Sequence, residues 1–149
     1  MVKTAITSLT STKAAIAGAL WLILYTAANL WPASFWFEVK DLRVLDATRD
    51  QPITLYVNRT IHRPFQATWT ATVKSIYSDT TVVACSTSAT NNYATNSVLP
   101  TTLTLGWWTN GTCKTLPQGK YILETTWVID PAFTPAKSIT VSSNIFTVL

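Results

Sequence analysis

The sequence predicts an all-β domain, an antiparallel β-sandwich of about seven or eight strands, preceded by one N-terminal transmembrane α-helix. Three observations predict this architecture. An uncharged apolar run occupies residues 14–31, and as a helix it is about 27 Å long, close to the apolar thickness of a bilayer. After Pro32, apolar and polar residues alternate with the period of β-strands. Turn-forming residues separate these alternating runs at short intervals.

The residues that flank the apolar run predict its orientation. Lys3 and Lys13 precede the run, and no acidic residue does. The positive-inside rule therefore predicts a cytoplasmic leader over residues 1–13, a signal anchor over residues 14–31 and an exported domain over residues 35–149. Cleavage of a signal peptide is the alternative, but the run is longer than the usual apolar region of such peptides. The anchor contacts membrane lipid, and four aromatic residues suit its interfaces: Trp21, Trp31, Phe35 and Trp36.

Composition excludes one class of partner. The chain has a formal net charge of +4, with 11 basic and 7 acidic side chains. Because two of the lysines precede the apolar run, the exported part is nearly neutral and lacks the positive charge of a nucleic-acid-binding surface. Charged residues are only 12% of the chain, and threonine takes their place on the polar faces, as is common in exported β-proteins.

Two cysteines follow the apolar run. In an oxidising compartment Cys85 and Cys113 are expected to form a disulfide that closes a long loop. Two buried free thiols are the alternative. A metal site is not expected, because these cysteines and His62 provide fewer than four ligands, and no cofactor motif is present.

Period-two alternation locates the strands. Residues 65–77 and 120–129 alternate most regularly, and residues 53–57, 83–85 and 103–107 follow the same pattern. The last run changes phase, which predicts a bulge near Ser143 and Asn144. The polar residues 86–100 are expected to form a mobile loop.

One motif is similar to that of a known family. Residues 116–127, LPQGKYILETTW, resemble the L-P-x-G-x-Y-x-L start of a late strand in immunoglobulin-like and fibronectin-III-like domains of bacterial and phage surface proteins. Trp69 is placed like the core tryptophan of such sandwiches. Over residues 35–149 the resemblance implies an Ig-like fold that binds or builds, with no catalytic residues. Cys113 lies in a turn, so the antibody-type bridge between the sheets is not implied.

Residues that could carry chemistry are few. His62 is the only histidine and lies in a predicted turn, and Glu124 is the only acidic residue within a regular strand, on its polar face. We therefore expect no enzyme. Strand phase predicts that Trp107 is buried and Trp108 exposed. Three aromatic residues form a candidate binding surface: Trp108, Tyr56 and Tyr93.

These observations favour a non-enzymatic, membrane-anchored display or assembly protein. Its exported domain is expected to bind a protein partner or to form part of an envelope or virion complex. Two alternatives stay open: a pilin-like filament subunit with a helical core, and a module that binds cell-surface carbohydrate. Asn58 and Asn110 lie in sequons and accept glycans only in a host that glycosylates them.

Overall fold

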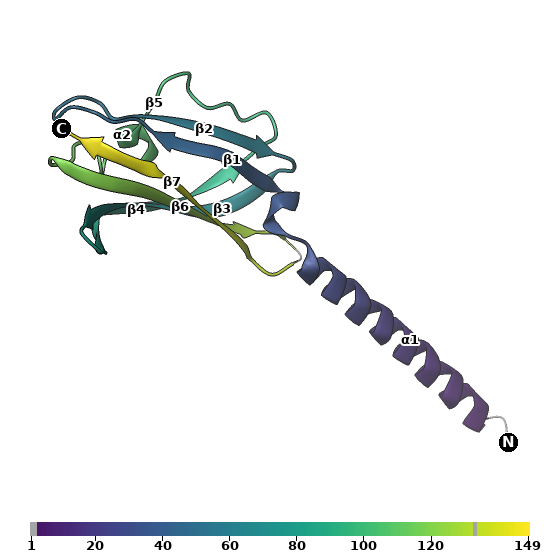
Figure 1. Cartoon of the computed structure of the whole chain (residues 1–149). Coiled ribbons are helices and arrows are strands. Elements are labelled where there is room, and N and C mark those ends of the chain that lie inside the picture. The colour runs from purple at the N-terminus through teal and green to yellow at the C-terminus, as the bar shows by residue number, and fades with distance from the viewer. Residues whose placement is uncertain (1–2, 133) are drawn as a thin grey trace.

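The computed structural model describes residues 3–132 and 134–149, with side chains from residue 11 onward. One helix is followed by seven described strands in two antiparallel sheets (Figure 1), as predicted. One sheet has the order β1-β2-β5, with β1 (Phe37–Val44), β2 (Thr54–Ile61) and β5 (Leu103–Thr104). The other has the order β4-β3-β6-β7, with β3 (Phe65–Tyr77), β4 (Thr80–Tyr93), β6 (Gly119–Asp130) and β7 (Lys137–Val148).

The core lies between the two sheets. Alternate residues of the central strands β3 and β6 point inward, so Ala67, Val73, Leu123 and Trp127 are almost fully buried. Phe37, at the start of β1, meets them from the other sheet and packs edge-on against Trp127. The predicted inward faces of residues 65–77 and 120–129 are thus confirmed.

The predicted bulge in β7 is present and joins the two sheets. The register shift leaves Ser143 and Asn144 opposite Leu123, whose amide donates to Ser143 Oγ at 3.0 Å. The freed Asn144 side chain then accepts from Val44 N and donates to Val44 O, both at 2.9 Å. One side of the sandwich is therefore closed by hydrogen bonds between β1 and β7.

The prediction of a loop over residues 86–100 is wrong for its first half. Strand β4 continues to Tyr93, because its polar residues pair across to β3. Thr72 with Ser86 and Thr68 with Thr90 each make a hydroxyl contact at 2.9 Å. Such cross-strand pairs stabilise a sheet without apolar burial.

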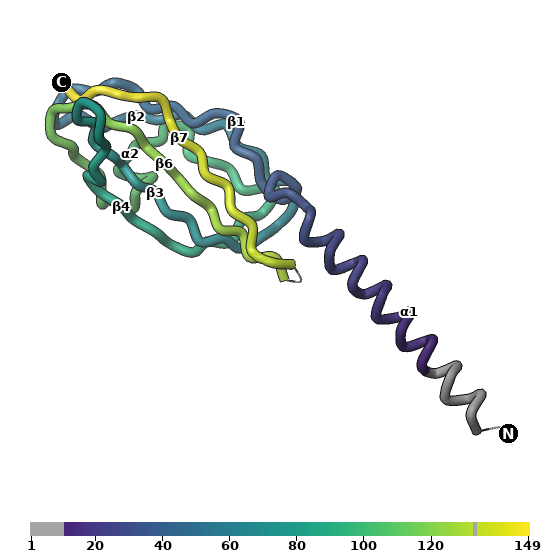
Figure 2. Tube along the Cα trace, turned by 60° about the horizontal axis from the view of Figure 1, so that its bottom comes forward, coloured from purple at the N-terminus to yellow at the C-terminus, as the bar shows by residue number. Residues whose placement is uncertain are grey.

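Helix α1 (Lys3–Leu30) projects from one end of the sandwich, and the C-terminus lies at the opposite end in both views (Figure 1, Figure 2). Its segment Ser11–Leu30 is long and apolar enough to cross a membrane, and none of the residues in its apolar window is buried. Residues 1 and 2 of the predicted leader lie outside the described residues. The helix ends just before Pro32, as proline chemistry requires.

The junction between α1 and the sandwich is ordered. After the 3₁₀ turn η1 (Ala33–Phe35), Lys137 Nζ donates to the carbonyl oxygen of Asn29 in the last helical turn. The Arg63 guanidinium lies 3.7 Å from the centre of the Phe35 ring. Trp36 is only 8% exposed and belongs to the core, so its prediction as a membrane-interface residue is wrong. Trp21 and Trp31 are exposed.

Candidate functional site

Residues 105–108 form a helical turn where the sequence predicted a strand. As a result, Trp107 is exposed and Trp108 is buried, the reverse of the prediction. After Thr104 the short helix α2 (Leu105–Trp108) begins, and the Thr104 hydroxyl caps it by accepting from Trp107 N at 3.2 Å. Residues three apart share one face of a helix, so Leu105 and Trp108 both point into the core. Trp108 is 6% exposed and Trp107 is 55% exposed. The predicted exposure of Trp108 is therefore wrong.

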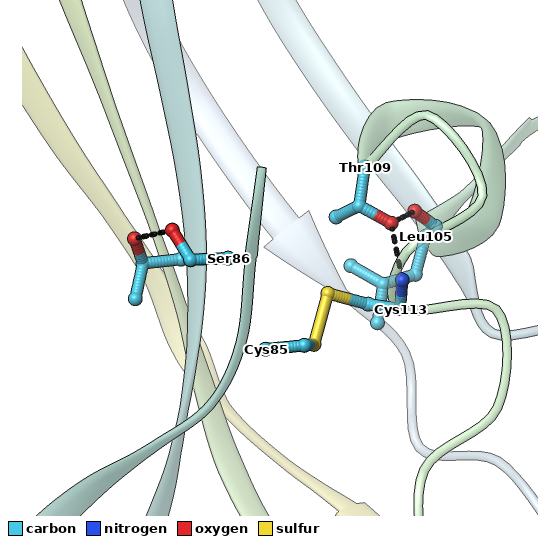
Figure 3. The surroundings of a disulfide bond; sticks show 6 residues. Cys85, Ser86, Leu105, Thr109 and Cys113 are labelled. Carbon is cyan, nitrogen blue, oxygen red and sulfur yellow. Dashed lines mark hydrogen bonds between the residues drawn. A yellow bond between two sulfur atoms is a disulfide. The ribbon is translucent and has the colours of Figure 1, made fainter. Parts of the chain in front are cut away.

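A buried threonine and a left-handed turn hold α2 in place. Thr109 Oγ1 donates to Leu105 O at 2.7 Å and accepts from Cys113 N at 3.0 Å (Figure 3). Asn110 and Gly111 have φ values of 50° and 83°, a region that favours glycine at the end of a helix. Gly111 N also donates to Gly106 O at 2.7 Å.

The predicted disulfide between Cys85 and Cys113 is confirmed. It ties the loop after α2 to strand β4, with a Cα–Cα distance of 5.9 Å (Figure 3). Because β4 and β5, the strand that leads into α2, belong to opposite sheets, the bridge secures the side of the sandwich away from β1 and β7. It also points to an oxidising, extracytoplasmic compartment.

Beside α2, this same side of the sandwich is hollowed by a cleft of about 570 Å³. We call it the Trp107 cleft. Its aromatic lining consists of Tyr93 and four tryptophans: Trp69, Trp107, Trp108 and Trp127. Arg59, the aliphatic residues Val98 and Leu99, and neutral polar side chains also line it, the polar ones being Asn91, Asn92, Ser97, Asn110 and Thr125. A cleft of this size and mixed lining is typical of small-molecule sites.

The structure brings together two of the three residues of the predicted binding surface. Trp108 and Tyr93 both line the Trp107 cleft, whereas the exposed Tyr56 is not among its lining residues. The expected exposure of Tyr93 is wrong, because its ring is 8% exposed and stacks on Phe65 at a centroid distance of 4.8 Å. Tyr93 and Trp108 therefore form the wall of the cleft rather than a projecting surface.

The polar atoms of this wall are satisfied within the protein. Trp108 Nε1 donates to Thr125 Oγ1 at 3.0 Å, and Trp69 Nε1 donates to the side-chain oxygen of Asn91 at 2.9 Å. Trp127 is 2% exposed and packs edge-on against the Trp108 ring at a centroid distance of 6.1 Å. The hydrogen bonds fix the positions of the Trp69 and Trp108 rings, because a buried polar group left without a partner is costly.

Electrostatics at the cleft come from one cation. The Arg59 guanidinium lies 5.6 Å from the centre of the Tyr93 ring, and burial lowers the pKa of Arg59. Burial also raises the pKa of Tyr93, although the neighbouring Trp127 side chain and the positive charge of Arg59 oppose this shift. Tyr93 is thus a neutral hydrogen-bonding group at physiological pH.

Sequence reasoning missed Trp107 and Arg59. A strand period of two that continues past Thr104 places Trp107 in the core, whereas the helical turn places it at the surface. A helix-start residue at Thr104 and Asn-Gly at 110–111 are the local signals of a capped turn. Nothing in the sequence marks Arg59, since its position depends on how β2 faces β4 across the sandwich.

His62 Nε2 lies 3.6 Å from Glu38 Oε2 on the exposed surface. The part of the chain that the structure describes holds no group of three His, Cys, Asp or Glu side chains placed for a metal ion. Comparison with protein-family models, curated proteins and solved structures finds no match to this chain.

Proposed function

We propose that this chain is a single-pass, membrane-anchored binding protein without enzymatic activity. Its exported sandwich presents the Trp107 cleft outside the membrane, where a partner binds or an envelope assembly forms. The bare apolar surface of α1 carries the proposal. None of the apolar window in the Ser11–Leu30 span is buried in the chain by itself, and apolar surface of that extent is stable only against lipid or other apolar helices.

Charge and redox chemistry support one orientation. Lys3 and Lys13 favour a cytoplasmic N-terminus, and the disulfide suits an oxidising compartment for the sandwich. Lys137 and Arg63 hold the end of α1 against the sandwich. Such a junction keeps the domain close to the bilayer in a defined pose, which is useful for display.

We infer further that the sandwich is Ig-like. The strand orders β1-β2-β5 and β4-β3-β6-β7 correspond to the two sheets of that architecture, except that the fourth strand, β4, lies at the edge of the sheet that contains β3, β6 and β7. Tyr121, at the start of β6, donates from its hydroxyl to Pro117 O at 2.8 Å, the contact known as a tyrosine corner. These features support the family resemblance of residues 116–127.

The two sequons supply a native test of the proposed topology. The full-length chain is translated with microsomes, whose lumen adds glycans to exported asparagines. We expect a glycosidase-sensitive mass increase and resistance to alkaline carbonate extraction, both from the uncleaved chain. The N58Q/N110Q variant is the control and should show no increase. Release by carbonate, or an unglycosylated wild-type chain, would contradict the proposal.

A filament subunit is the second candidate, because α1 projects from the sandwich as a free helix (Figure 1). In that arrangement copies of α1 pack together and the sandwiches face outward. Gly18 has no atom near its Cβ position, which leaves space for a close helix neighbour. N-terminal sequencing of the mature protein separates the candidates, since a start at Ala14 or Ala15 indicates leader removal and a filament.

A further inference from the structure

Trp107 stands between two adjoining hollows. The Trp107 cleft, of about 570 Å³, and a second hollow of about 330 Å³ share Gly106, Trp107 and Gly111 in their linings. The second hollow continues along the 50–53 turn and Lys114. A ligand longer than one ring can therefore occupy both hollows and cross the Trp107 side chain between them.

Trp107 is the tryptophan in this region that is available to a ligand. The indole nitrogens of Trp69 and Trp108 have partners inside the protein, and Trp127 is only 2% exposed. The Trp107 ring is 55% exposed, and no described residue accepts a hydrogen bond from its indole nitrogen. Its flat face and free N–H suit a ring that is apolar on its face and polar at its rim, which is the chemistry of a pyranose sugar.

The polar lining fits hydroxyl groups. The Asn110 amide offers both a donor and an acceptor, as a hydroxyl does, and the Asn92 amide nitrogen and the Ser97 hydroxyl add further polar groups to the lining. The capped α2 turn and the disulfide hold this wall in place. A rigid site loses little conformational entropy when a ligand binds.

Arg59 adds a charge preference. The larger hollow has no acidic side chain in its described lining, whereas the smaller one is lined by Asp50 together with Lys114. No carboxylate of the described residues forms an ion pair with the Arg59 guanidinium, which lies over the Tyr93 ring. Burial lowers the pKa of Arg59, as expected for a cation that has lost water without gaining an anion. A ligand carboxylate would supply that anion through a paired hydrogen bond.

We propose that the two hollows form one site for an acidic saccharide, a chain of pyranose rings that carries carboxylate groups. One ring stacks on Trp107, and a carboxylate pairs with Arg59. The inference rests on the proposed display function and names the chemical class of its partner. Its test uses detergent-solubilised protein and does not depend on membrane topology. A negative binding result would therefore contradict this inference without contradicting the proposed topology.

The test is calorimetric titration of the purified full-length protein with tetragalacturonate. Cellotetraose, which has rings without carboxylates, and polyglutamate, which has carboxylates without rings, are the comparison ligands. We expect tetragalacturonate to bind more tightly than either. Equal binding of polyglutamate would indicate an acidic-peptide site, and absence of tetragalacturonate binding would exclude the saccharide; either result overturns the proposal.

Two variants assign the roles of the residues. W107A should weaken tetragalacturonate binding about tenfold or more, since a tenfold loss corresponds to about 1.4 kcal/mol; W21A, with the same change on exposed α1, should not. R59M should remove the preference over cellotetraose, whereas R43M, at an exposed arginine of β1, should keep it. Unchanged binding by W107A, or unchanged preference by R59M, in a variant with the wild-type melting temperature contradicts the assigned role.

Discussion

Single side chains complete the connections that the backbone leaves open. Asn144 replaces a missing backbone pair between β7 and β1, with two bonds of 2.9 Å to Val44. Ser143 satisfies the amide of Leu123 in the same bulge. At the cleft, Thr125 and Asn91 do the same for tryptophan nitrogens. In a chain so poor in charge, these short neutral side chains do much of the polar pairing.

Replacement of Asn144 tests this role. N144A removes both bonds to Val44 and leaves its backbone groups unpaired at the seam between the sheets. We expect the free energy of unfolding to fall by about 1–3 kcal/mol, measured by urea denaturation. The control N96A changes an exposed asparagine in the 94–102 loop and should leave stability nearly unchanged. An N144A chain as stable as the control would show that the seam does not depend on this side chain.

Tyr93 predicts a loss of stability at alkaline pH. Burial raises the pKa of Tyr93 above its ordinary value of 10.0, so the unfolded chain releases this proton at lower pH than the folded one. The contribution of protonated Tyr93 to the free energy of unfolding is fully present below pH 10. It is lost as the pH rises from there through the raised pKa of the folded state. Y93F should therefore lose less stability than wild type between neutral and strongly alkaline pH, in thermal unfolding. Y56F, at an exposed position, should follow wild type.

At the scale of elements, the short α2 turn decides which side chains line the cleft. Its helical period places Trp108 in the core and Trp107 outside, and its end depends on Gly111 at φ 83°. The β7 bulge has a similar effect, since two residues opposite one release Asn144 to reach β1. Both elements are local departures from regular strand, and each creates a contact that a regular strand would lack.

Gly111 tests the α2 turn. G111A places a Cβ on a residue with positive φ, so we expect a loss of about 1–2 kcal/mol and a changed environment for Trp107. Thermal unfolding measures the first effect and acrylamide quenching of tryptophan fluorescence the second. The matched control G18A adds a Cβ into open space on α1 and should leave unfolding of the sandwich unchanged. Equal melting temperatures for both variants would contradict the role of the turn.

Across the whole molecule, the two sides of the sandwich are closed by different means. Hydrogen bonds between β1 and β7 close one side, and parallel pairing at Ala47 and Val148 extends that seam. The disulfide secures the other side, beside the Trp107 cleft. The disulfide therefore joins the two sheets on the side where the cleft lies between them.

Removal of the disulfide should lower the stability of the whole domain. The bridge spans 28 residues, and loop closure over that length is worth about 3.5 kcal/mol in the chain-entropy estimate. We expect a fall of that order for C85A/C113A in urea denaturation, and a matching fall for wild type under reducing agent. If reducing agent also lowered the stability of the double variant, the effect of reduction would not come from this bond.

Local pattern in the sequence determined the elements that depend on nearest neighbours. The span of apolar residues and Pro32 set the helix and its end, period-two alternation set β3 and β6, and the phase change located the β7 bulge. The disulfide followed from the presence of two cysteines beyond an export signal. In each case the physical cause lies within a few residues along the chain or in the compartment.

Only the tertiary structure decided the cleft. Whether residues 105–108 continue a strand or turn helical depends on how Leu105 and Trp108 fill space against β6, which no local period reports. Trp36 does not lie at the membrane interface as predicted, because it belongs to the hydrophobic core beside the start of β1. Arg59, Tyr93 and Trp107 are far apart in sequence and line one cleft because two sheets face each other. Packing between distant segments, rather than local propensity, sets these positions.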